Sequence, residues 1–172
     1  MRDEGGYTLI ELLTVLVIFG IVSTALTGLF VSATQAEVSS NRRFQAQQNA
    51  RLALDKLRRE VHCASTATVT GGSLVTLTLP NSTCRGYPQV SWCAVGSGTR
   101  YALYRNMGAT CSAAGTKYVD YLTSNALFSY VSPTTEVLAR LSVSFPVNTK
   151  PSEAEEAYSL SDQLTLRNSS RL

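Results

Sequence analysis

The stretch LLTVLVIFGIVSTALTGLFVSATQA, from Leu12 to Ala36, decides the fold of this chain. It contains no charged residue. As an α-helix with a rise of about 1.5 Å per residue it measures roughly 37 Å, which is enough to cross a bilayer core of about 30 Å. We therefore expect a membrane-spanning helix, followed by one globular body built from the more polar remainder of the chain.

The composition of the 172 residues agrees with a folded protein. Apolar residues make up 44% of the chain, which is too many for a disordered protein. The 15 basic and 12 acidic residues give a net charge of +3. This charge is too small and too scattered to make nucleic acid the favoured partner, but it does not exclude a DNA receptor.

A specific motif lies at the start of the apolar stretch. The leader, residues 1–6, is short and acidic, and the string Gly6-Tyr7-Thr8-Leu9-Ile10-Glu11 leads into the helix. A secretory signal peptide would have a basic start, a shorter apolar core and a cleavage site after that core. The string instead resembles the prepilin signature of type IV pilins and type II secretion pseudopilins.

The resemblance implies proteolytic processing at Gly6. A membrane-embedded prepilin peptidase would cut after Gly6 and methylate the new amine of Tyr7. Tyr7 replaces the more usual Phe of the family, and the leader is acidic where the family's is commonly basic. The protein would then wait in the membrane, with lipid around its helix, until an inner-membrane assembly platform driven by a cytoplasmic ATPase moves it into a filament with other pilins.

Glu11 is an ionisable side chain at the start of the apolar helix. A carboxylate in a membrane segment costs about 2.5–3.5 kcal/mol on insertion scales, so it is normally paired or functional. No Lys or Arg lies between Gly5 and Glu37, but cleavage after Gly6 creates an ammonium group at Tyr7. The resemblance implies that Glu11 pairs with such an amine of a neighbouring chain during assembly. The alternative is a carboxylate that merely reaches water at the membrane interface.

Beyond Ala36 the helical pattern continues with a single apolar face. Its apolar residues recur at helical spacing, at Ala46, Ala50, Leu54, Leu57 and Val61. A solvated face is expected to carry Arg51, Lys56, Arg58, Arg59 and Glu60. Because no proline precedes Pro80, we predict one helix from Tyr7 to about His62, with local unwinding or close helix packing at Gly20 and Gly28.

After Cys63 the apolar period falls to two, which indicates β-strands. The expected strands are Thr66–Thr70, Val75–Leu79, Val90–Val95, Tyr101–Arg105, Val137–Phe145 and Tyr158–Leu166. The first four form two hairpins across glycine turns, and Pro146 is expected to end the fifth. Short connections favour an antiparallel meander that lays one face on the helix. The predicted fold class is α+β, with a long N-terminal helix, half transmembrane and half amphipathic, on an antiparallel sheet.

The four cysteines all lie in the body, at Cys63, Cys84, Cys93 and Cys111. They lack the C-x-x-C spacing of zinc ribbons and thioredoxins, so two disulfides in an oxidising compartment are predicted. Three connectivities are possible, and we favour Cys63–Cys84 with Cys93–Cys111. Disulfides place the body outside the cytoplasm, whereas the positive-inside rule, applied to Arg42 and Arg43, would place it inside.

The sequence contains few residues that could form a catalytic or metal-binding site. His62 is the only histidine and stands at the expected helix end, where we expect it to cap terminal carbonyls. No nucleophile, base and orienting group can be named together. The acidic residues Glu153, Glu155 and Glu156 lack the spacing of a calcium loop. We therefore expect no enzyme, no metal and no cofactor.

Two weaker similarities extend the resemblance. The stretch Ala50–Val61 looks like the helix of minor pilins and J-component minor pseudopilins, and Leu166-Arg167-Asn168 looks like their C-termini. The expected organisation is a leader (1–6), a transmembrane and assembly helix (7–33) and an extracytoplasmic pilin-like α+β domain (34–172). The resemblance implies a minor pilin or pseudopilin, first in the bacterial cytoplasmic membrane and then in a pilus or pseudopilus. The alternatives are a major pilin subunit, or a membrane-tethered adhesin or DNA-binding module.

Overall fold

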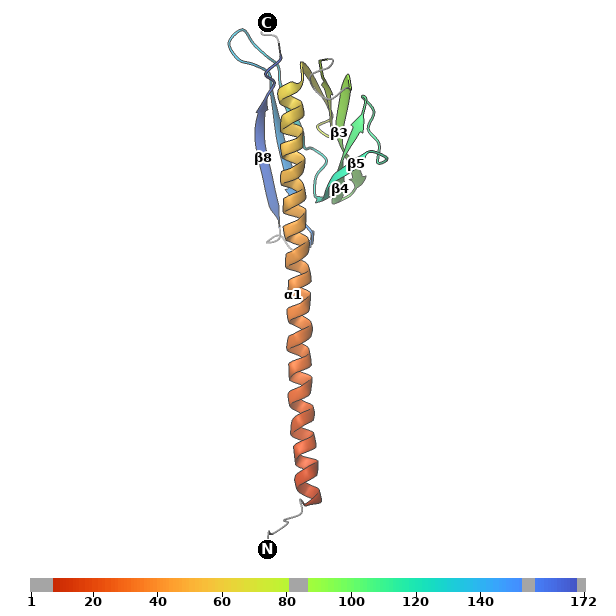
Figure 1. Ribbon diagram of the computed structural model, residues 1–172, viewed down its shortest axis with the longest axis vertical. Coiled ribbons are helices and arrows are strands. Elements are labelled where there is room, and N and C mark those ends of the chain that lie inside the picture. The colour runs from red at the N-terminus through yellow and green to blue at the C-terminus, as the bar shows by residue number, and fades with distance from the viewer. Residues whose placement is uncertain (1–7, 81–86, 153–156, 170–172) are drawn as a thin grey trace. The chain divides into compact units, whose positions relative to one another are not determined.

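The computed structural model of the protein describes residues 8–80, 87–152 and 157–169. The chain forms two compact units, Met1–Asn41 and Arg42–Leu172. Helix α1 (Leu9–Cys63) is the first element, and all the described strands follow it in the second unit (Figure 1). The predicted α+β class is confirmed.

Helix α1 is the single long helix that the sequence predicts, with 55 residues. It stays helical through Gly20 and Gly28, so the local unwinding considered for these glycines does not occur. No heavy atom outside the helix's own backbone lies within 4 Å of a Cβ built on either glycine. Neither glycine therefore marks a close packing contact within this chain.

The predicted apolar stripe of α1 is confirmed. Ala46, Ala50, Leu54, Leu57 and Val61 are all buried, and Ala53 joins them. Full burial of a leucine side chain contributes about 1.5–3 kcal/mol. The predicted solvated face is wrong at Glu60, which is only 5% exposed. Lys56 of the same face is also largely shielded, because its side chain is 14% exposed.

Eight strands follow the helix in the described residues. They are β1 (Thr66–Thr70), β2 (Leu74–Thr78), β3 (Gln89–Ser97), β4 (Arg100–Met107), β5 (Thr116–Leu122), β6 (Phe128–Val131), β7 (Arg140–Val147) and β8 (Tyr158–Thr165). All strand pairs are antiparallel, and the two predicted hairpins, β1–β2 and β3–β4, are confirmed. Strands β5 and β6 were not predicted.

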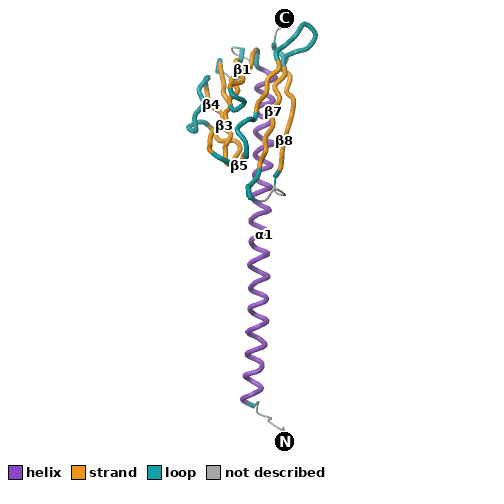
Figure 2. The backbone as a smooth tube through the Cα atoms, turned by 180° about the vertical axis from the view of Figure 1, so that it is seen from behind, coloured by secondary structure: helices purple, strands orange, loops and turns teal. Residues whose placement is uncertain are grey.

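The sheet is not the simple meander expected from the sequence. Strands β1 to β5 follow one another in space, but the next neighbour of β5 is β7, with β6 beyond it. β7 pairs with β8 along its whole length, with β6 over four residues, and with β5 only at Leu122 and Val147. The sheet therefore curls, and the end of α1 has β7 and β8 on one side and β3 to β5 on the other (Figure 2).

Strand β7 differs from its predicted bounds at both ends. It begins at Arg140, because the chain before it makes a turn in which the Thr134 N–H donates to the Val137 carbonyl, and Val137 is 42% exposed. It continues past Pro146 to Val147. A proline lacks only the backbone donor, and the Pro146 carbonyl still accepts a hydrogen bond from the N–H of Thr123.

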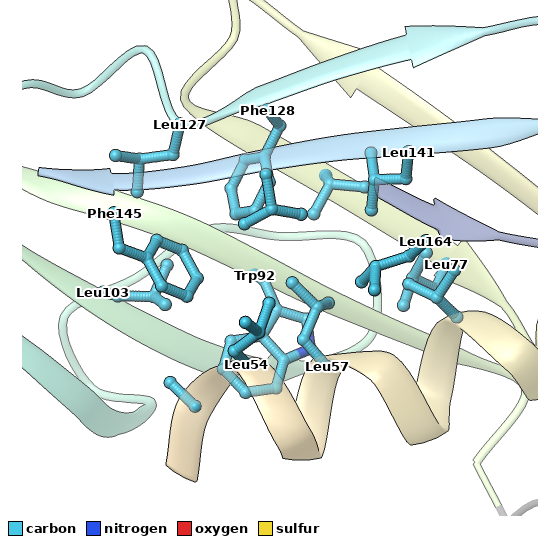
Figure 3. Packing of buried hydrophobic residues seen from close by; sticks show 14 of the residues in the cluster. Leu54, Leu57, Leu77, Trp92, Leu103, Leu127, Phe128, Leu141, Phe145 and Leu164 are labelled. Carbon is cyan, nitrogen blue, oxygen red and sulfur yellow. The ribbon is translucent and has the colours of Figure 1, made fainter. Parts of the chain in front are cut away.

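The core lies between the second half of α1 and the inner face of the sheet. Leu54 and Leu57 of the helix face Trp92 of β3, which is fully buried (Figure 3). Further core residues come from most of the strands: Leu77, Leu103, Phe128, Leu141, Phe145 and Leu164. One contiguous apolar cluster therefore binds the helix to both parts of the curled sheet.

The end of β5 carries an unusual backbone conformation. Tyr121 is the only described residue other than glycine with a positive φ, at 63°. The carboxylate of Asp120 accepts its N–H at 2.8 Å, and the guanidinium of Arg100 lies 4.5 Å from its ring centroid. Burial alone would raise the pKa of Asp120, but this N–H and the cations Lys117 and Arg100 outweigh burial and lower that pKa.

Candidate functional site

Glu11 lies in the first turn of α1, where the structure gives it a local partner. Its Oε2 accepts hydrogen bonds from the N–H and the hydroxyl of Thr8, at 3.4 and 3.2 Å. Thr8 immediately precedes the helix, so the pair forms one half of a capping box. The sequence signal for it was the T-x-x-E spacing of Thr8 and Glu11. Gly6 and Tyr7 lie outside the described residues, so the cleavage site stays a prediction.

The part of α1 that follows Glu11 is apolar and exposed. An 18-residue window has a mean hydropathy of 2.4, and none of that window is buried. From Leu9 to Val31 the large apolar side chains are 47–84% exposed. A continuous apolar surface of this extent is expected to meet lipid or another protein rather than water. By length and composition the helix is able to cross a membrane.

Most hydroxyl side chains of this segment are satisfied within the helix. Five of them donate to carbonyls three or four residues earlier, at 2.8–2.9 Å: Thr14, Thr24, Thr27, Ser32 and Thr34. An unpaired hydroxyl would be costly in hydrocarbon, and these bonds remove most of that cost. The polar residues of the stretch are therefore compatible with an apolar environment.

Glu60 forms a buried clamp between α1 and the sheet. Its Oε1 accepts a hydrogen bond from Arg105 Nε at 2.9 Å, and its Oε2 accepts one from Trp92 Nε1 at 2.8 Å. Lys56, one turn earlier on the helix, lies 3.4 Å from the same Oε1. Trp92 belongs to β3 and Arg105 to β4, so one carboxylate ties the helix to two strands.

The opposite flank of α1 is tied to β8. Arg58 donates to the carboxylate of Asp162 at 2.8 Å, and this hydrogen bond raises the pKa of Arg58. His62 does not cap the helix carbonyls as predicted, because its Nδ1 lies 3.0 Å from the Thr165 carbonyl oxygen. The helix end is capped instead by Asn168, which donates to the Cys63 carbonyl at 2.9 Å. The C-terminal segment thus closes the end of the helix.

The structure joins Cys93 and Cys111 in a disulfide. Cys93 is fully buried, and this bond holds residues 108–115 over the face of β3 and β4 that is turned away from Trp92. There the hydroxyl of Ser91 donates to the Thr110 carbonyl at 2.8 Å. A Cβ at Gly115 would lie 2.6 Å from the backbone carbonyl oxygen of Arg105, which cannot move aside, so the close approach requires glycine. Cys63 is also disulfide-bonded, while Cys84 lies outside the described residues, as do Glu153, Glu155 and Glu156.

The paired state of the cysteines leads to a direct test. Alkylation of the unreduced protein in denaturant should modify none of the four cysteines, because disulfide sulfurs do not react as thiolates. Intact-mass analysis measures the number of labels, and a reduced sample, in which all four should react, is the control. Labelling without reduction would contradict the predicted pair of disulfides.

Comparison with protein families places a signal on the same N-terminal segment. Residues 1–27 match the family model of the prokaryotic N-terminal methylation motif, which is the signal of type IV pilins and pseudopilins. The chain carries a prepilin methylation motif. No curated protein and no solved structure matches the chain.

The methylation motif covers the leader, the Gly6-Tyr7 junction, Glu11 and the first part of α1. It supports a pilin or pseudopilin, and it points to a structural subunit rather than an enzyme. It also implies processing by prepilin peptidase and assembly with other pilins. Together with the exposed apolar helix, it fits anchoring in a membrane. The unit Arg42–Leu172 lies outside the match.

Proposed function

We propose that this protein is a minor pilin or pseudopilin, a structural and assembly subunit of a type IV pilus or a type II secretion-like filament. The observation that supports it is the methylation motif at the start of an uninterrupted 55-residue helix whose first half is apolar and exposed. The apolar half anchors the protein as a single span in the cytoplasmic membrane, with the α+β body outside. The same half later packs in the filament core.

Prepilin peptidase cuts after Gly6 and methylates Tyr7, and the assembly platform then moves the mature chain into the filament. The stretch Ala50–Val61, which resembles minor components, and the disulfide of the body support a minor subunit over a main one. Glu11 is the residue that selects partners, because its charge demands a counter-charge in an apolar surrounding.

Replacing Gly6 with leucine should leave the six-residue leader on the protein. A bulky side chain at the cleaved bond is expected to block the peptidase, whereas Gly5→Leu, one position earlier in the leader, should still be processed. Intact-mass analysis of protein from its own host reads out both the loss of residues 1–6 and the added methyl group. A wild-type protein that begins at Met1, or that is cut near Ala33, would contradict the proposal.

A further inference from the structure

Two cations share one carboxylate between α1 and β4. Lys56 Nζ and Arg105 Nε lie 3.4 and 2.9 Å from the same oxygen of Glu60. The three side chains are 14%, 12% and 6% exposed, respectively. One positive charge is therefore left over in a place that is largely shielded from water. A shielded charge is costly unless it is paired.

The donors of Arg105 are mostly unused. Glu60 Oε2 is already occupied by the indole N–H of Trp92, and only Nε of Arg105 has a hydrogen-bond partner among the described residues. In that part of the chain no fully buried side-chain nitrogen or oxygen lacks a partner. The two Nη atoms of Arg105 are therefore not fully enclosed and retain some access to solvent, although the side chain as a whole is only 12% exposed.

The other ion pairs of the body do not share this property. Arg58 lies between two carboxylates, those of Asp55 and Asp162. The cations around Asp120 also outnumber it, but the side chains of Arg100 and Lys117 are 61% and 51% exposed, so water solvates their surplus charge. Of the described ion-pair clusters, only the one at Glu60 combines a surplus cation with burial.

We propose that Arg105 and Lys56 form a binding site for an oxyanion, a carboxylate or a phosphate group. The free guanidinium edge offers two parallel N–H donors, the geometry that carboxylates and phosphates accept in bidentate fashion, and Lys56 adds a second charge. The bound anion neutralises the surplus charge. Because the two cations are largely shielded from water, the attraction is stronger than that of a surface pair.

A substitution of Lys56 distinguishes anion binding from the structural link that Glu60 makes between helix and sheet. The link between helix and sheet needs only Glu60 with Arg105 and Trp92, and those contacts remain when Lys56 is removed. A variant at Lys56 is thus expected to fold, while its affinity for an anion falls. The proposal does not depend on whether the protein assembles into a filament.

Trp92 provides a specific reporter for the test. It is the only tryptophan of the chain, and its indole N–H donates to Glu60 at 2.8 Å. The full chain in detergent micelles is titrated with sodium acetate and, separately, with sodium phosphate, and sodium chloride keeps the ionic strength constant. We expect a saturable shift of the indole N–H resonance. Saturation with acetate identifies a carboxylate site, and saturation with phosphate alone identifies a phosphate site.

Three variants make the result decisive. Lys56→Gln should weaken binding about tenfold, the usual effect of losing one charge-assisted contact. Lys56→Arg, which keeps the charge, should retain binding even if the glutamine variant folds poorly. Lys117→Gln, at an exposed cation of β5, should leave the titration unchanged. A resonance that does not move, a shift that never saturates, or equal binding by wild type and Lys56→Gln would overturn the proposal.

Discussion

Glu60→Ala should lower the free energy of unfolding of the body by about 3–5 kcal/mol. The substitution leaves the largely buried cations of Arg105 and Lys56 without their carboxylate. It also leaves the buried indole N–H of Trp92 without an acceptor, which adds to the cost. Urea unfolding of the full chain in micelles, followed by the fluorescence of Trp92, measures the effect as a lower midpoint.

Asp55→Ala is the matched control for Glu60. Asp55 is also an acidic residue of α1 with an arginine partner, but its side chain is 60% exposed. Exposed pairs of this kind contribute about 0–1 kcal/mol, so the variant should unfold nearly as the wild type does. Glu60→Gln should fall between the two, because its amide oxygen still accepts a hydrogen bond. Equal losses for Glu60→Ala and Asp55→Ala would refute the clamp.

Glu60 also shows what the helical pattern cannot reveal. It lies beside the apolar stripe, next to Val61, and its neighbours Arg58 and Arg59 are partly or fully solvated, so a solvated position was the natural prediction. Its burial depends on Arg105, 45 residues later in the chain. Pairing between such distant residues leaves no periodic signal, because periodicity reports only local geometry.

The helix and the hairpins were predictable because their signals are local. Ala46 to Val61 repeat with the helical period, and Val75 and Leu77 alternate with threonines after a glycine turn. β5 lacks such a pattern, since only Val119 and Leu122 are buried and Tyr121 interrupts its regular backbone. The place of β7 between β5 and β6 depends on contacts between residues that are distant in the sequence. It is fixed by burial of Leu141 and Phe145 rather than by any turn residue.

At the N-terminus the sequence motif was more informative about function than the fold was. The family signal was readable from Gly6-Tyr7 and Glu11, and the match to residues 1–27 agrees with it. The hydrogen bonds between Thr8 and Glu11 add a second role for the carboxylate, as a cap of the helix. Any test of Glu11 in assembly must therefore separate loss of its charge from loss of its cap.

Glu11→Ala should insert into the membrane and lose its leader, but it should fail to enter the filament. Removal of the carboxylate makes insertion less costly, by about 2.5–3.5 kcal/mol on insertion scales. The cleaved bond after Gly6 is unchanged. In the filament core the Tyr7 ammonium of a neighbouring chain would be buried without a counter-charge, a penalty of several kcal/mol, so incorporation should drop at least about a hundredfold. The Cys93–Cys111 disulfide of the body should still form.

Thr8→Val distinguishes the charge of Glu11 from its contact with the Thr8 hydroxyl. This variant removes the hydroxyl contact of 3.2 Å but keeps the carboxylate and the backbone N–H contact of 3.4 Å. Loss of a complete N-cap costs about 0.5–2 kcal/mol of helix stability, and this variant loses only part of the cap because the Thr8 N–H still donates to Glu11. In an apolar filament core the packed neighbours also hold the helix in place. Thr8→Val should therefore still be incorporated. The measurement is the ratio of the tagged variant to its partner pilins in isolated filaments or tip complexes. Normal incorporation of Glu11→Ala would reduce Glu11 to an interfacial carboxylate, and equal failure of both variants would assign its role to the contact with the Thr8 hydroxyl.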